Sequence, residues 1–322
     1  MSDARRPVIV IPGDDPVQLA GSPHLERLKQ YGDVVLHPDR PSSDAEKLRR
    51  AAEADVLLNS RGAVKWPGHL LRVLPKLRFI TVCGIGTDSI DLQAARERGI
   101  VVSNIPGKTA PVVAEHALAL MLAAAKRLAF QTAELRAGRW TRMDNILLAG
   151  KTLGVVGTGA IGARMALLAR AIGMRVIAWT FHPSAERAKE LELHYVELDD
   201  LLRQSDVVSL HVKLTPKSRG LIGRREIALM KPSSILVNTA RGAIVDTEAL
   251  VAALRGGHLG GAALDAYDIE PLLPDHPLLS CAQVVLSPHN ADQTPEGNDL
   301  LNAGAVDNVI AFLKGKPQNV VT

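Results

Sequence analysis

Short apolar runs alternate with amphipathic stretches along almost the whole chain of 322 residues. Mostly β-branched or aliphatic runs predict buried strands, while apolar residues spaced three and four apart predict helices between them. Ser22 is a suitable N-cap for the first helix, with Pro23 at its first position and Gly32 beyond its end. Strands are expected at 7–12, 33–37, 55–60, 77–84 and 100–104. This alternation predicts a small parallel α/β unit that ends near Asn104.

A second series of strands and helices begins at residue 151, after a long helix expected at roughly 110–137. Its later strands are expected at 174–180, 206–212, 233–240, 261–267 and 283–289. The turn at 106–107 and the loop at 289–294 are expected to be the two crossings between the domains. The last helix, about 295–314, would then return to the first domain. We therefore predict two parallel α/β domains, one of residues 1–104 and 293–322 and one of residues 105–292.

Composition narrows the classes of protein. Apolar residues make up 47% of the chain and aromatic residues only 3%, which favours a helix-rich α/β core. The net charge is +4, but the basic residues are scattered, so no nucleic-acid site and no membrane span are expected. Cys83 and Cys281 offer no zinc spacing, and no metal site is expected. A reducing, cytoplasmic compartment is the simpler interpretation.

A glycine-rich turn lies between the first strand and the first helix of the second series. Gly157, Gly159 and Gly162 have the G-x-G-x-x-G spacing in a strand–turn–helix context, which is typical of a Rossmann-type dinucleotide-binding domain. Gly157 would make the tight turn, Gly159 would let the backbone approach a pyrophosphate, and Gly162 would let helix and strand pack closely. The phosphates would lie at the helix N-terminus beside Ala160 and Ile161. A plain tight turn without a ligand is the alternative.

The residue after the second strand of this domain is unusual for such a site. An acidic residue that would bind the adenosine ribose is expected about 20 residues after the turn, but Thr180 stands there. Thr180 cannot supply a charged acceptor, and His182 and Arg187 follow it. NADP(H) is therefore plausible beside NAD(H). An exposed loop and helix surface is the alternative interpretation of His182 and Arg187.

Polar residues follow several strands, where ligands bind in open parallel sheets. They are His211, Arg241, Asp265, Glu270 and His289. Arg241 offers a planar fork for a carboxylate, and His289 can exchange a proton near neutral pH. Glu270 could favour the protonated imidazole. Taken singly, each has an ordinary alternative as a surface ion pair, a capped turn or an acidic turn, but their joint position favours a catalytic site.

From about residue 55 to 313 the chain resembles the D-isomer-specific 2-hydroxyacid dehydrogenase family, which includes phosphoglycerate dehydrogenases and glyoxylate/hydroxypyruvate reductases. The motifs that carry the resemblance are "CGIGTDSIDLQAARERGIVVSNIPG", "VAEHALALMLA", "NTARGAIVDTEALVAAL", "LDAYDIEPL" and "SPHNADQTP". The resemblance implies a Rossmann-type dinucleotide-binding domain and a smaller, flavodoxin-like parallel α/β substrate domain, with a cleft that closes between them. It also implies a homodimer formed through the helix after Pro106, which is apolar around much of its circumference.

The same resemblance implies roles for individual residues. Arg241 would bind the substrate carboxylate and carbonyl, His289 would be the acid/base, and Glu270 would favour its imidazolium. Asp265 would lie near the nicotinamide amide, with Thr239 and Ala240 lining the cofactor site. The substrate site would be completed by Arg61 and by the backbone of Gly84, Ile85 and Gly86.

The reaction expected from these residues is hydride transfer between NAD(P) and a small 2-oxo acid or D-2-hydroxy acid. A phosphite- or formate-type dehydrogenase on the same fold is one alternative, although a formate enzyme would be expected to lack Glu270. A non-catalytic, dinucleotide-sensing interaction protein like the family's corepressors is another. The sequence "HNADQTP" departs from the commoner "HIGG" continuation, which leaves the identity of the 2-oxo acid open.

Overall fold

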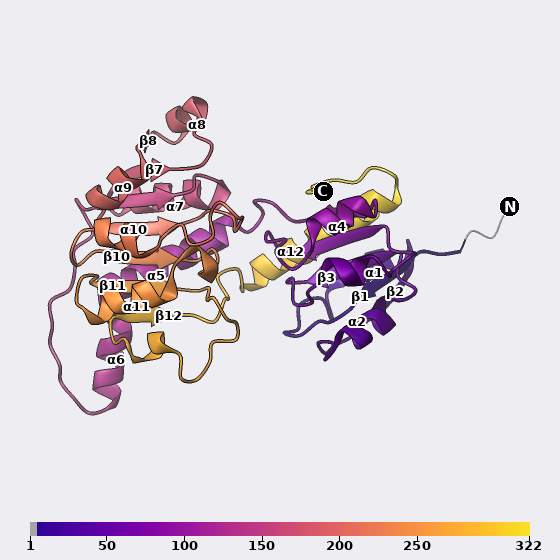
Figure 1. The fold of residues 1–322 in the computed structure, drawn as a ribbon, viewed down its shortest axis with the longest axis horizontal. Coiled ribbons are helices and arrows are strands. Elements are labelled where there is room, and N and C mark those ends of the chain that lie inside the picture. The colour runs from indigo at the N-terminus through magenta and orange to yellow at the C-terminus, as the bar shows by residue number, and fades with distance from the viewer. Residues whose placement is uncertain (1–4) are drawn as a thin grey trace. The chain divides into compact units, whose positions relative to one another are not determined.

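The computed structural model describes residues 5–322, which form two compact units (Figure 1). Unit 1 comprises residues 5–109 and 293–322, and unit 2 comprises Ala110–Asp292. Unit 1 extends beyond Asn104, where the sequence analysis placed its end. The reason is that Ile105 still belongs to this unit, since its N–H donates to the Gly84 carbonyl at 2.9 Å.

Unit 1 is built on a five-stranded parallel sheet with the strand order β2-β1-β3-β4-β5, which is the flavodoxin-like order. The strands are β1 (Val8–Ile11), β2 (Asp33–Leu36), β3 (Val56–Ser60), β4 (Phe79–Cys83) and β5 (Val101–Ser103). β3 and β4 are buried along their whole length, as parallel strands covered on both faces usually are. The predicted flavodoxin-like fold of this unit is confirmed.

Helices cover both faces of this sheet. The helices are α1 (Pro23–Leu28), α2 (Asp44–Ala51), α3 (Gly68–Leu71), α4 (Leu92–Glu97) and α12 (Pro295–Leu313). Ala51, Leu71 and Ala95 from α2, α3 and α4 share one apolar cluster, while Leu28 and Val306 from α1 and α12 share the other. Thr294 caps α12, and its hydroxyl accepts a hydrogen bond from the Gly297 N–H.

The last helix completes the core of unit 1 although it lies far away in the sequence. α12 packs on β4, and its buried Asn308 donates hydrogen bonds to Thr81 Oγ1 at 3.3 Å and to the Asn104 carbonyl at 2.8 Å. Beyond α12, Val320 forms an antiparallel bridge with Ser103 at the edge of the sheet. The final segment therefore supplies both a covering helix and an edge contact.

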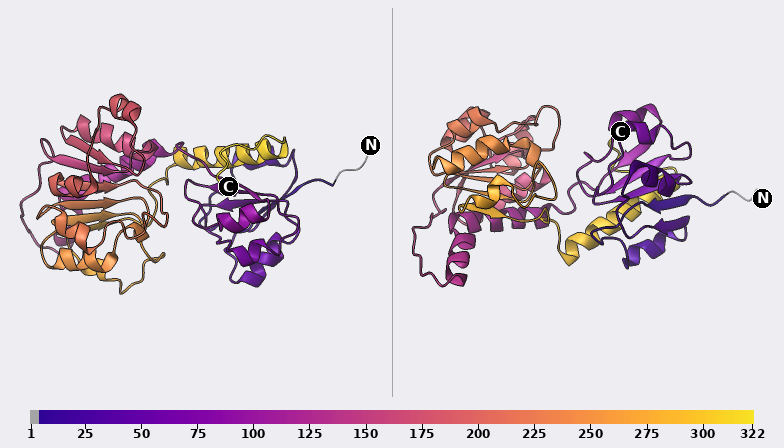
Figure 2. Two further views of the ribbon diagram at one scale, coloured as in Figure 1. Left: turned by 45° about the horizontal axis from the view of Figure 1, so that its top comes forward. Right: turned by 60° about the horizontal axis from the view of Figure 1, so that its bottom comes forward.

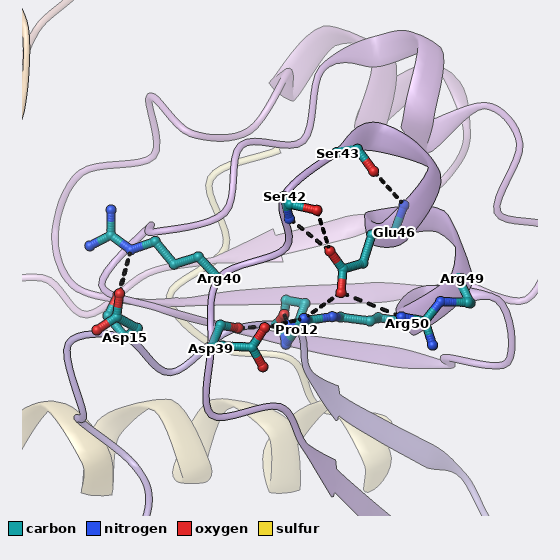
Figure 3. Close-up of polar contacts among 9 residues, drawn as sticks. All are labelled: Pro12, Asp15, Asp39, Arg40, Ser42, Ser43, Glu46, Arg49 and Arg50. Atoms are coloured by element: carbon teal, nitrogen blue, oxygen red, sulfur yellow. Dashed lines mark hydrogen bonds and ion pairs between the residues drawn. The ribbon is translucent and has the colours of Figure 1, made fainter.

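The segment after β1 is fixed by a buried cation (Figure 3). Arg50 has a side chain that is only 3% exposed, and it donates to the Pro12 carbonyl at 2.8 Å and to the carboxylates of Asp39 and Glu46 at 2.6 Å each. Hydrogen bonds from Ser42 and Arg50 lower the pKa of Glu46 to about 2. A charge-assisted network of this kind holds the ends of β1 and β2 together.

Unit 2 is built on a seven-stranded parallel sheet with the order β12-β11-β10-β9-β6-β7-β8. The strands are β6 (Thr152–Val156), β7 (Arg175–Trp179), β8 (His194–Tyr195), β9 (Val207–Leu210), β10 (Ile235–Asn238), β11 (Gly261–Leu264) and β12 (Val284–Leu286). The strand order reverses at β6 and β9, as in the Rossmann fold, so this prediction is also confirmed. A ligand is expected beside the carboxyl ends of these two strands.

Two layers of helices cover the faces of this sheet. The helices are α5 (Ala110–Ala125), α6 (Leu128–Arg136), α7 (Ala160–Ala171), α8 (Ala185–Glu190), α9 (Leu198–Gln204), α10 (Arg224–Leu229) and α11 (Thr247–Arg255), with short 3₁₀ turns at Gly242–Ile244 and Pro277–Ser280. α5 and α7 share one apolar cluster, and α9, α10 and α11 share the other. None of the helices among residues 5–322 is both long enough and apolar enough to cross a membrane.

The single long helix predicted at 110–137 is wrong, because the structure has two helices there. α5 ends at Ala125, and Arg127 has a left-handed backbone with φ of 50°. The Gln131 amide donates to the Lys126 carbonyl at 2.7 Å, and the Lys126 ammonium donates to the Ile146 carbonyl at 2.8 Å. α6 therefore leaves in a new direction, as Figure 2 shows, and buries none of its residues.

The apolar circumference of α5 is largely explained by its own unit. It packs against α7, β10, β11 and β12. Its buried residues are Ala110, Val113, Ala114, Ala117, Leu120, Met121, Ala124 and Ala125. The apolar pattern of this helix is thus not by itself an argument for a second subunit.

Candidate active site

The glycine turn after β6 has the geometry that its three glycines suggest. Gly157 has φ of 98°, and its N–H donates to the Trp179 carbonyl at 2.7 Å. A Cβ on Gly162 would lie 1.9 Å from the Gly157 carbonyl oxygen, so helix α7 and the turn pack too closely for any side chain there. A Cβ on Gly159 would meet no atom of the chain within 4 Å. The turn is therefore tightly packed against α7 at Gly162, while the space next to Gly159 is free of protein atoms.

This open side fits the pyrophosphate of a nicotinamide dinucleotide. α7 begins at Ala160, followed by Ile161, and no side chain caps its N-terminus at Gly159. The first-turn N–H groups and the helix dipole favour an anion at this place. Thr239 Oγ1, after β10, is buried without a hydrogen-bond partner among the described residues, and the neighbouring Ala240 is half-buried. An unpaired buried hydroxyl at a strand end suits a polar group of a bound ligand.

The expected adenosine end contains a cation that touches the glycine turn. Thr180 follows β7 directly and is half-buried, and His182 is exposed. Arg187 donates from Nη1 to the Thr158 carbonyl at 2.8 Å, and Thr158 Oγ1 lies 2.8 Å from the Tyr195 hydroxyl. The structure thus brings Arg187 to the turn but does not bring His182 into a described contact.

A histidine and a glutamate form a direct pair on the loops after β11 and β12. His289 Nδ1 lies 2.7 Å from Glu270 Oε2, and the Tyr267 N–H donates to Glu270 Oε1 at 2.9 Å. Burial by itself raises the pKa of Glu270, but the hydrogen bonds from His289 and Tyr267 outweigh it, so the pKa lies below its usual value. Glu270 is therefore ionised near neutral pH and orients the imidazole through Nδ1, which leaves Nε2 for chemistry.

Asp265 holds the loop that carries His289. It is fully buried and accepts hydrogen bonds from Ser287 Oγ at 2.7 Å and from the N–H groups of Asn290 and Ala291 at 3.0 and 2.9 Å. Burial by itself raises the pKa of the Asp265 carboxyl. The hydrogen bonds from His116 and from these three donors outweigh the effect of burial, so the pKa lies below its usual value. Asp265 is thus committed to the loop of His289, and its contact with a nicotinamide amide stays a prediction.

Arg241 stands at the end of β10, on a loop held by Asn238. The Asn238 amide donates to the Arg241 carbonyl at 2.9 Å and accepts from the Ala240 N–H at 3.0 Å. The charge of Arg241 contributes to the low pKa of Glu270, which places the guanidinium in electrostatic range of that carboxylate. A Cβ on the next residue, Gly242, would lie 1.9 Å from the Tyr267 carbonyl carbon. Only glycine lets the two loops pack against each other.

His211 directly follows β9, the strand that pairs with β6 before the glycine turn. Its Nε2 lies 2.9 Å from Ser209 Oγ, and burial lowers its pKa to about 4. The imidazole is therefore neutral near pH 7 and supplies no positive charge for binding a phosphate. A Cβ on Gly157 would lie 2.8 Å from the His211 backbone, so this residue forms the wall of the turn.

The residues predicted to bind substrate in unit 1 lie at the carboxyl ends of its strands. Arg61 follows β3 with φ of 49° and donates to Gln18 Oε1 at 3.2 Å. The carbonyls of Gly84 and Ile85 accept from the Ile105 N–H at 2.9 Å and from the Asn104 amide at 2.6 Å. Each of these carbonyls shares a peptide group with the N–H of the next residue, which is Ile85 or Gly86. In a trans peptide the C=O and the N–H point in opposite directions, so these two N–H groups point away from Ile105 and Asn104.

Comparison with known proteins identifies the family. Residues 118–291, within unit 2, match the model of the NAD binding domain of D-isomer specific 2-hydroxyacid dehydrogenases. A glyoxylate reductase from Aeropyrum pernix is 43% identical, with 92% of this chain and 92% of that protein covered. The chain belongs to the D-isomer specific 2-hydroxyacid dehydrogenase family. The prediction of an NAD(P)-dependent enzyme of this family is thereby confirmed.

Solved structures of this dehydrogenase family agree with the whole fold. A glyoxylate reductase from Paecilomyes thermophila superimposes with a TM-score of 0.89 at 30% identity, covering 98% of both chains. An NADPH-dependent glyoxylate/hydroxypyruvate reductase from Sinorhizobium meliloti, in complex with NADP and malonate, gives a TM-score of 0.87 at 30% identity, covering 98% of this chain and 97% of that one.

Sequence reasoning missed several residues that shape this dehydrogenase's site. Ser287 and His116 support Asp265, with His116 Nε2 3.0 Å from Ser287 Oγ, and Tyr267 supports Glu270. Only Gly242 had a readable signal, because a glycine directly after a functional arginine suggests a close approach of backbones.

Proposed function

We propose that this dehydrogenase reduces a small 2-oxo acid to the 2-hydroxy acid, of D configuration where the product is chiral, with glyoxylate and hydroxypyruvate as the best substrates. The observation that carries the proposal is the 2.7 Å pair of His289 and Glu270 on the same sheet as the open glycine turn. A nicotinamide held by these residues would supply the hydride for the carbonyl carbon. His289 gives a proton from Nε2 to the carbonyl oxygen, and Arg241 binds the carboxylate and stabilises the developing alkoxide.

The remaining site residues have supporting roles in this proposal. Residues Gly157, Gly159, Ala160, Ile161 and Gly162 hold the pyrophosphate, and Thr239, Ala240 and Asp265 line the nicotinamide end. In unit 1, which serves as the substrate domain, Arg61 and the backbone of Gly84, Ile85 and Gly86 bind the substrate. Residues 110–292 serve as the dinucleotide-binding domain.

A substrate panel with both reduced cofactors tests the reaction. Turnover of glyoxylate or hydroxypyruvate, followed by the absorbance of the reduced nicotinamide, is expected. Formate and phosphite are tested separately with NAD+ and NADP+, because both compounds would be oxidised, and turnover of either would favour the alternative dehydrogenases. Folded protein that binds dinucleotide but turns over none of these compounds would favour a dinucleotide-sensing interaction protein.

We infer that NADPH is used at least as well as NADH. Thr180 has no carboxylate that could accept a hydrogen bond from a free 2′-hydroxyl or repel a 2′-phosphate. Arg187 supplies a cation beside the turn. A hydrogen bond to a charged acceptor is worth about 1.5–3 kcal/mol, or roughly 10–100-fold in affinity. Thr180→Asp is therefore expected to shift the kcat/KM ratio toward NADH by that factor. A wild-type preference for NADH of about 100-fold, the upper end of the same range, would contradict the inference.

We also propose a cytoplasmic homodimer. Since α5 is covered within its own unit, the interface is assigned to α6 and the loop after it. Trp140 is 81% exposed, and Leu128, Leu135 and Leu147 are each more than half exposed. Large exposed apolar side chains on one segment of the chain suit an interaction surface. Light scattering at micromolar concentration is expected to give the mass of two chains, and a monomeric mass would exclude a stable dimer.

A further inference from the structure

A glutamine from a distant loop lies against the arginine that follows β3. Arg61 donates from Nη1 to Gln18 Oε1 at 3.2 Å, across 43 positions of sequence. Gln18 itself is only 6% exposed. The Gln293 amide lies against the same guanidinium, so Gln18 is one of two side chains that limit the rotamers of Arg61.

The amide of Gln18 is held in one orientation by α12. Its Nε2 donates to Asn302 Oδ1 at 2.7 Å, and Asn302 Nδ2 donates back to the Gln18 carbonyl at 2.8 Å. Asn302 is 5% exposed. Because Asn302 Oδ1 accepts a hydrogen bond from the Gln18 amide N–H, Gln18 presents its oxygen, the acceptor, to Arg61.

The backbone that carries Gln18 is tied to the strand that carries Arg61. Asp14 is fully buried and accepts from the N–H groups of Gln18 and Ala20 at 3.1 and 2.8 Å. The same carboxylate accepts from Ser60 Oγ at 2.9 Å, and Ser60 directly precedes Arg61. Figure 3 shows the other anchors of this segment, which are the contact of Arg50 with Pro12 and that of Arg40 with Asp15.

The same network reaches the second predicted substrate loop. Cys83 Sγ lies 3.7 Å from Asn302 Oδ1, and Cys83 directly precedes Gly84–Gly86. Asn302 therefore contacts both Gln18 and the strand end that leads into this loop. One buried amide on α12 links the two parts of unit 1 that the proposed function assigns to the substrate.

We propose that Gln18 and Asn302 are a positioning pair that fixes Arg61 for binding the anionic 2-oxo acid. The pair acts through Arg61 and touches neither substrate nor cofactor. This inference rests on the proposed function, in which Arg61 lines the substrate site. Preordering the guanidinium reduces the entropy lost when substrate binds, so the pair acts on KM more than on kcat.

Gln18→Met tests the pair, because it keeps the side-chain volume and removes both polar atoms. KM for glyoxylate is expected to rise about 3–10-fold, the usual worth of one hydrogen bond, with kcat and the KM for NAD(P)H within about twofold of wild type. Gln93→Ala is the control, since Gln93 bonds only to exposed Glu97 among the described contacts.

A double-mutant cycle with Arg61→Ala decides whether Gln18 acts through Arg61. In the Arg61→Ala background, Gln18→Met is expected to add no further rise in KM. A full additional rise would overturn the positioning role, and so would a raised KM in Arg61→Ala together with an unchanged KM in Gln18→Met. If Arg61→Ala itself leaves KM unchanged, the substrate site of the proposed function is wrong, and this inference is overturned with it.

Discussion

Removing the charge of Glu270 tests the pairing of the site most directly. Glu270→Gln keeps the shape of the side chain and removes the negative partner of His289, 2.7 Å away. Both side chains are more than a third exposed, so the dielectric of water applies to their interaction. At that distance and dielectric, Coulomb's law gives about 1.5 kcal/mol. This free energy corresponds to a displacement of about one pH unit in the activity profile.

The sign of the displacement follows from which form of the imidazole reacts. Reduction needs the protonated form, so activity is lost as the pH rises, and a weaker preference for that form moves this alkaline limb to lower pH. Oxidation needs the neutral form, so its acidic limb moves to lower pH as well. The measurement is kcat/KM against pH in both directions, for wild type and Glu270→Gln.

A neighbouring carboxylate on the same loop provides the control. Asp268 lies two positions before Glu270, and its Oδ1 is 3.5 Å from His276 rather than from His289. Asp268→Asn changes the net charge by the same amount and is expected to leave both limbs in place. Limbs that stay unmoved in Glu270→Gln, or that move equally in both variants, would refute the assigned pair.

Three further substitutions examine the rest of the site. His289→Ala is expected to lower kcat by about 10²–10⁴-fold, the usual worth of a positioned general acid, and a wild-type kcat would exclude this role. Arg241→Lys is expected to lose most of kcat/KM, because an ammonium cannot make the two-pronged contact; near-normal kcat/KM would show that Arg241 is not the carboxylate clamp. Gly242→Ala is expected to destabilise the fold by about 1–3 kcal/mol, since its Cβ has no room beside Tyr267, and an unchanged Tm would contradict this packing.

The sequence predicted those parts of the fold that depend on local pattern. The strands around Gly157 were readable because an apolar run, a glycine turn and an amphipathic helix follow one another within a short segment. The break at Arg127 was not readable, because no glycine or proline marks it and the turn depends on contacts with residues beyond α5. β8 was missed because its two residues, His194 and Tyr195, show no periodicity.

The sequence predicted which residues form the site but not the hydrogen bonds that hold them in place. His289 and Glu270 were found because polar residues after parallel strands gather at one edge of a sheet. The bonds from Asp265 to Ser287 and to the loop after His289 join residues more than 20 positions apart, and no spacing rule reports such contacts. The orientation of Gln18 by Asn302, 284 positions away, is unreadable for the same reason.

The way in which unit 1 is divided along the chain affects how it folds during synthesis. Residues 110–292 leave the ribosome between its two segments, which takes on the order of 10–40 s at usual translation rates. Until α12 emerges, Ile9 and Phe79 lack the cover of Leu301 and Val306, and of the two helices that share this apolar cluster only α1 is present. Unit 2 is continuous and can fold first. Nascent chains halted before residue 295 therefore expose apolar surface of the kind that chaperones bind.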